Sequence, residues 1–185
     1  MRHPVGQPPV AILAYGSLIG EPGVALDAVI ERRTPCRTPF PVEYARSSPR
    51  WGGGPVLTPH PDGGPVDGCL LHLAAHVDVG TAIDLLSERE GVESARGIVA
   101  VAGFGGGLLV LSACLDRNLP APDMEPRHLA ARAVASAATG PRNGIAYVAR
   151  AVEAGILTPR TREYVAAILS LTGARSLEEA QRLVA

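Results

Sequence analysis

Residues 10–18 read VAILAYGSL, an apolar run that passes directly into a polar turn containing a glycine. The apolar run predicts a buried strand over Val10–Tyr15. Gly16 lets a ligand approach the main chain, and successive N–H groups, together with the Ser17 hydroxyl, form a concavity suited to a carboxylate or an oxyanion. The candidate binding residues are therefore Tyr15, Gly16, Ser17 and Leu18. The alternative is a plain turn after an edge strand, with Tyr15 in the core.

The length of the chain and the distribution of its apolar, Gly and Pro residues predict one α+β domain over residues 1–185 with a helical C-terminal third. Up to about residue 115, short apolar runs alternate with Gly and Pro clusters, which is typical of strands and loops. The predicted strands are Val10–Tyr15, Pro41–Arg46, Val56–Pro59, Gly68–Leu73, Ile98–Ala102 and Leu108–Cys114. The predicted helices cover residues 21–32, 78–90, 126–138, 143–154 and 158–171, and a capping box at Ser176 and Glu179 begins a last short one.

Two glycine-rich segments need a separate interpretation. The uncharged segment Gly97–Leu115 has four glycines at its centre, so two strands joined by a turn fit it better than a membrane span. The segment Ser47–Gly68 holds six Gly and five Pro in 22 residues. It cannot form a helix, and we expect a functional loop over a pocket.

The composition excludes several classes of function. The 17 basic and 18 acidic residues give a net charge of −1, so no nucleic-acid or anionic-membrane partner is indicated. All basic residues other than histidine are arginines, which excludes a Schiff-base lysine, a pyridoxal phosphate anchor and a phosphate-loop lysine. Cys36, Cys69 and Cys114 form no CxxC pair, so neither a disulfide framework nor a thiolate zinc site is predicted. We expect a soluble cytoplasmic protein without a metal.

A second motif, LLSEREGV, occupies residues 85–92 and places Glu90 at the end of an amphipathic helix that Gly91 terminates. A carboxylate at this position is a candidate general base. The alternative is a solvated charge cluster, Glu88–Arg89–Glu90, on an exposed helix end. Glu88 points to a different side of the helix from Glu90.

A third motif, TGPRNGIAY, occupies residues 139–147 and leads from a Gly-Pro turn into a helix that carries Tyr147. The functional interpretation places the Tyr147 hydroxyl on a ligand. The alternative is a packed aromatic side chain.

In this order, the three motifs resemble the γ-glutamylcyclotransferase family, and the resemblance spans most of the chain. The Tyr-Gly-Ser turn follows the first strand as it does in that family, and residues 87–92 resemble its acidic segment. The glycine-rich segment from Trp51 to Gly68, which runs into a strand, is also similar. Residues 140–147 resemble the glutathione-acting, ChaC-type branch of the family.

The resemblance implies a small mixed β-barrel with flanking helices and release of 5-oxoproline from a γ-glutamyl amino acid, a glutathione-like peptide or an amine. It maps the catalytic acidic residue onto Glu90 and the substrate cradle onto residues 15–18. Tyr147 is then a further substrate contact, and no cofactor is needed. The family commonly has a tyrosine shortly after the catalytic glutamate, and in this chain Arg96 is the candidate replacement.

Two other functions stay open at this stage. One is a γ-glutamylamine cyclotransferase that removes a protecting group in small-molecule biosynthesis. The other is a non-catalytic protein that binds a small ligand on the same fold. The leaving amine and the oligomeric state also stay open, with a homodimer as one option.

Overall fold

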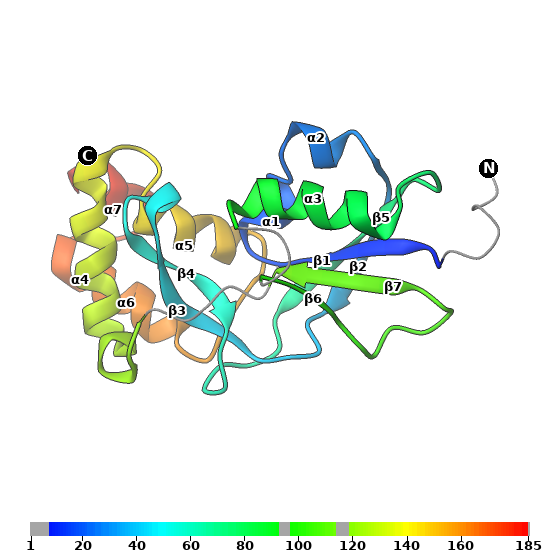
Figure 1. The fold of residues 1–185 in the computed structure, drawn as a ribbon. Coiled ribbons are helices and arrows are strands. Elements are labelled where there is room, and N and C mark those ends of the chain that lie inside the picture. Colours follow the sequence, from blue (N-terminus) through cyan, green and yellow to red (C-terminus); the bar gives the residue numbers. More distant parts are fainter. Residues whose placement is uncertain (1–7, 93–96, 114–118, 185) are drawn as a thin grey trace. The chain divides into compact units, whose positions relative to one another are not determined.

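The computed structural model describes residues 8–92, 97–113 and 119–184. Contacts within the chain divide it into two compact units, each made of two separate segments. Unit 1 comprises Met1–Pro39 and Asp67–Leu115, and unit 2 comprises Phe40–Val66 and Asp116–Ala185. Each unit has its own sheet and its own helices (Figure 1). One domain over residues 1–185 stays a prediction.

Unit 1 contains a five-stranded mixed sheet in the order β2-β5-β1-β7-β6. The central strand β1 (Val10–Ala14) pairs antiparallel with β5 (Asp67–Leu73) and parallel with β7 (Leu109–Ala113). The outer strands are β2 (Ile30–Arg37) and β6 (Ile98–Ala100). All five residues of β1 are buried, which explains why its sequence is uniformly apolar rather than alternating.

The helix α3 (Val79–Glu90) covers one face of this sheet (Figure 1). Every second residue of β1 faces α3, and Ile12 shares the core with Ala82 and Leu86 of the helix. The Asp78 side chain caps the start of α3 by accepting a hydrogen bond from the Thr81 amide at 2.8 Å. The predicted helix over residues 78–90 is therefore confirmed, as is the hairpin of two strands in the uncharged segment after residue 97.

The α+β class is confirmed, but the expected closed barrel is wrong for the described residues. Among these, β2 and β6 each pair on one side only, so the five-stranded sheet is open. The helical C-terminal third is confirmed. It contains α4 (Pro126–Ser136), α5 (Gly144–Glu153), α6 (Thr161–Thr172) and α7 (Leu177–Val184).

The single helix predicted over residues 21–32 is also wrong. Two single-turn helices, α1 (Ser17–Gly20) and α2 (Val24–Asp27), are followed by the edge strand β2 from Ile30 onward. Most residues of β2 are exposed or half-buried, so the strand carries no alternating apolar pattern. Backbone pairing with β5 determines its conformation, and such pairing overrides weak local preferences.

Unit 2 packs its four long helices with a hairpin of β3 (Val42–Ser48) and β4 (Gly54–Pro59). A 3₁₀ turn, Pro49–Trp51, lies between the two strands. The predicted functional loop over residues 47–68 is therefore largely this ordered hairpin. Glycine is needed where the start of β4 lies against the start of α5, because a Cβ on Gly54 would lie 2.5 Å from the Cα of Gly144.

Candidate active site

The turn after β1 has a backbone that only glycine adopts readily. Gly16 has φ 62° and ψ −139°, a combination that is strongly disfavoured for residues with a Cβ. The chain then enters α1 at Ser17, and the first-turn amides of Ser17 and Leu18 have no acceptor within this helix. The predicted turn is therefore confirmed as a structural feature, and it lies at the C-terminal end of the central strand.

Two of the four predicted cradle residues also hold the turn in place. The Tyr15 hydroxyl donates a hydrogen bond to the Ala113 carbonyl of β7 at 3.2 Å. The Leu18 side chain is buried in the core beneath α3. This leaves the Ser17 hydroxyl and the backbone amides as the groups of the turn that are suited to contact a ligand.

The last turn of α3 separates its two glutamates. Glu90 lies four residues after Leu86, which is fully buried, whereas Glu88 lies two residues after it and is exposed. Residues four apart share a helix face and residues two apart do not. Gly91 ends the helix in the left-handed region with φ 67°. The interpretation of residues 88–90 as solvated charges is therefore correct for Glu88 alone.

Arg89 connects Glu90 to the Tyr-Gly-Ser turn. Its guanidinium donates from Nη1 to Oε1 of Glu90 at 2.7 Å and from Nη2 to Oγ of Ser17 at 3.1 Å. Its Nε donates to the backbone carbonyl of Glu21 at 3.0 Å. The exposed fractions of the Arg89 and Glu90 side chains are only 7% and 12%. The structure thus brings together the two predicted elements of unit 1.

The electrostatics of this cluster are balanced. The Glu90 carboxylate is largely buried and loses hydration, and the guanidinium in direct contact with it compensates for that loss. A cation in the last turn of a helix also interacts favourably with the negative end of the helix dipole. The two members of the ion pair therefore stabilise each other at this end of the helix.

Sequence reasoning missed Arg89 as a site residue. Its position three residues after Leu86 could have indicated this role, because it places Arg89 on the apolar face of the helix. Arg96, the candidate replacement for the family's tyrosine, lies outside the described residues.

The third predicted element, Tyr147, belongs to unit 2. Its ring is buried and makes edge contacts with the rings of Trp51 and Tyr44, at centroid distances of 5.0 and 6.3 Å. Its hydroxyl accepts a hydrogen bond from the Leu57 amide at 3.2 Å. These contacts give Tyr147 a packing role in unit 2, and a substrate contact by Tyr147 stays a prediction.

In the described part of the chain, no cluster of His, Cys, Asp and Glu side chains is suited to hold a metal ion. None of the helices described in it has the length and apolar character needed to cross a membrane. Comparisons with protein-family models, with curated proteins and with solved structures give no match for this chain.

Proposed function

We propose that this protein is a γ-glutamylcyclotransferase that releases 5-oxoproline from a γ-glutamyl amino acid, a glutathione-like peptide or an amine. The observation that carries the proposal is the bridge through Arg89, which holds a largely buried carboxylate next to the Tyr-Gly-Ser turn. A general base and a set of oxyanion donors are the two features that this cyclisation requires. The resemblance of the three motifs to this family supports the same function.

The reaction needs one proton carrier. Glu90 accepts a proton from the α-ammonium group of the substrate, and the free amine then attacks the γ-carbonyl carbon. A ring C–N bond forms, and the negative charge on the carbonyl oxygen is stabilised by the Ser17 and Leu18 amides. Glu90 returns this proton to the leaving nitrogen as the original amide bond breaks. The ring nitrogen gives up its second proton to water, and the released amine takes up a proton from water. The products are 5-oxoproline and the ammonium form of the amine, so protons and bonds balance without a cofactor.

Arg89 has a positioning role in this mechanism. It holds the Glu90 carboxylate in one place, which lowers the entropic cost of proton transfer. Its contact with Ser17 fixes the distance between the Glu90 carboxylate and the Tyr-Gly-Ser turn.

The proposal also includes the fold of the family and a cytoplasmic location. The five-stranded mixed sheet with α3 across one face supports such a fold, with the sheet open rather than closed into a barrel. The substrate is a small molecule, and we expect no nucleic-acid or membrane partner.

The test is to measure 5-oxoproline release from a panel of γ-glutamyl compounds by the wild type, Glu90→Gln and Glu88→Gln. Glutamine keeps the size of the side chain but cannot accept the α-ammonium proton. We expect Glu90→Gln to lower kcat by about 10²–10⁴. The exposed control Glu88→Gln should retain wild-type turnover.

The other outcomes separate the alternatives. Turnover restricted to γ-glutamylamines would indicate removal of a protecting group in biosynthesis. Binding without any release of 5-oxoproline would indicate a non-catalytic binding protein. Undiminished turnover by a folded Glu90→Gln variant would refute the mechanism.

A further inference from the structure

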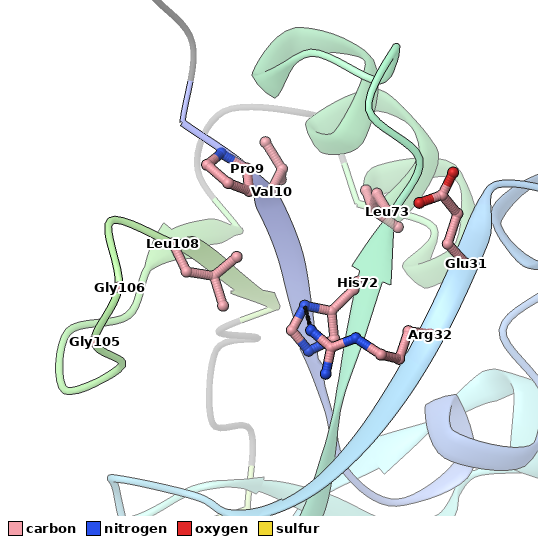
Figure 2. A pocket seen from close by; sticks show the side chains of 9 residues that line it. All are labelled: Pro9, Val10, Glu31, Arg32, His72, Leu73, Gly105, Gly106 and Leu108. Carbon is pink, nitrogen blue, oxygen red and sulfur yellow. Dashed lines mark hydrogen bonds between the residues drawn. The ribbon is translucent and has the colours of Figure 1, made fainter. Parts of the chain in front are cut away.

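A pocket of about 450 Å³ lies in unit 1 at the start of β1, where Pro9 and Val10 form part of its wall (Figure 2). The candidate active site lies after the other end of the same strand. The five residues of β1 separate the two by roughly 16 Å at the usual rise per residue. The pocket is therefore distinct from the site assigned to cyclisation.

An irregularity in the edge strand brings charged side chains to this pocket. The pairing of β2 with β5 shifts between Ile30 and Arg32, so Glu31 is an extra residue opposite β5. Such a bulge interrupts the alternation of side chains between the two faces. Arg32 and Glu31 consequently both line the pocket. In Figure 2 the Glu31 carboxylate points away from the Arg32 guanidinium.

His72 and Thr34 hold the Arg32 guanidinium. Nη2 of Arg32 lies 3.1 Å from Nδ1 of His72, and Nη1 lies 2.7 Å from Oγ1 of Thr34. A guanidinium has donors only, so Nδ1 of His72 must accept. The proton of the neutral ring is then on Nε2, which donates to Oγ1 of Thr34 at 3.1 Å.

The charge of Arg32 is not matched by these partners. Both partners are neutral, and among the described residues no carboxylate lies within ion-pair distance of the guanidinium. Partial burial and the nearby Arg32 charge lower the pKa of His72, which keeps the imidazole neutral near pH 7. Arg32 has five N–H donors, and two contacts leave several of them for a ligand.

Next to Leu108, part of the pocket wall is backbone without side chains. Gly105 and Gly106, between β6 and β7, line the pocket, and Gly106 has φ 78°. A Cβ built on either glycine would meet nothing within 4 Å, so packing does not explain the absence of side chains. Glycines at such a wall let a ligand approach main-chain amides.

We propose that this pocket binds a small oxyanion, a phosphate or a carboxylate, through the Arg32 guanidinium. Arginine is the side chain best suited to such groups, because its planar fork of donors matches their oxygen atoms. The ligand is small, because the Glu31 carboxylate on the same rim repels an extended polyanion.

The test follows the histidine ring signals of the full chain by NMR during pH titrations, with inorganic phosphate, acetate or chloride at equal ionic strength. A bound anion offsets the Arg32 charge, so phosphate should raise the pKa of His72 in a saturable manner. The exposed His76 reports any general effect of salt. A response to acetate as well as phosphate indicates a general oxyanion site, and a response to phosphate alone indicates a phosphate site.

Two variants complete the design. Arg32→Gln should weaken phosphate binding by about 10- to 100-fold, as expected for loss of a hydrogen bond from a charged group. Arg33→Gln is the matched control, because Arg33 is paired with Asp27 and does not line the pocket. The proposal is overturned if phosphate leaves the His72 titration unchanged, if His76 shifts equally, or if the folded Arg32→Gln variant responds as the wild type does.

Discussion

At the scale of single residues, Arg89 differs from the exposed arginines because three of its N–H groups have fixed acceptors. These acceptors come from three separate places: Glu90 on its own helix, Ser17 in the turn and the main chain of Glu21. A lysine has one ammonium group on a flexible stem and cannot satisfy the same three acceptors with this geometry. The position therefore requires arginine for geometry as well as for charge.

Substitution of Arg89 should lower turnover more than substrate binding. In Arg89→Gln the Glu90 carboxylate loses the guanidinium that fixes its position, and Ser17 loses its contact with the same group. We expect kcat to fall by about tenfold or more while KM changes little. Arg89→Lys keeps the charge but not the three contacts, so it should also lower kcat.

The readout is the separate change of kcat and KM in 5-oxoproline release. Arg33→Gln, which removes an exposed ion pair with Asp27 in the same unit, is the control and should leave both values unchanged. A purely structural role for Arg89 would lower the free energy of unfolding while kcat and KM of the remaining folded enzyme stayed the same.

At the scale of elements, the end of α3 determines where Glu90 lies. The helix buries Ala82 and Leu86 against the sheet, and Gly91 then ends it with φ 67°. A Cβ on Gly91 would meet nothing within 4 Å. The need for glycine is therefore conformational and not steric.

This distinction gives a prediction for Gly91. Gly91→Ala should lower the free energy of unfolding by about 1 kcal/mol, because alanine is disfavoured in the left-handed region. Gly91→Asn should cost less, since asparagine tolerates that region better than other residues with a side chain. Denaturation with urea measures both values. Equal stability of the alanine and asparagine variants would show that the helix end relaxes into another conformation.

The elements also show which predictions were possible from sequence. The helices α3 and α5 can be predicted from capping residues and apolar spacing within their own sequences. In α5, for example, the Asn143 side chain caps the helix by accepting a hydrogen bond from the Ala146 amide at 3.0 Å. The edge strand β2 has no comparable signal, because solvent covers much of it and its pairing partner β5 lies about 35 residues away in the chain. The helix predicted in its place rested on local propensity alone.

At the scale of the whole molecule, neither unit is a continuous piece of chain. The helical C-terminal third belongs to unit 2 together with residues 40–66. Within that unit, Tyr164 packs on Tyr44 at a centroid distance of 5.0 Å, and Thr158 donates to the buried Glu43 carboxylate at 2.6 Å. The hairpin therefore supplies both aromatic and polar partners to the helices.

A fragment experiment tests this dependence. Residues 119–185 expressed alone should lack a cooperative thermal transition, because Tyr147 and Tyr164 lose their aromatic partners. The same fragment fused through a flexible linker to residues 40–66 should recover one. Circular dichroism during heating distinguishes the two cases. Cooperative melting of residues 119–185 alone would show that the helices form a sufficient core.

The sequence by itself determined the features that depend on neighbouring residues: the apolar strand β1, the turn at Gly16, the termination of α3 at Gly91 and the class of the fold. Only the tertiary structure decided that the sheet is open, that β2 is a strand, and that Arg89 links Glu90 to Ser17. The physical reason is the range of the interactions. Caps, turns and helix periodicity act over a few residues, whereas sheet pairing and the Arg89 bridge join groups that are tens of residues apart in the chain.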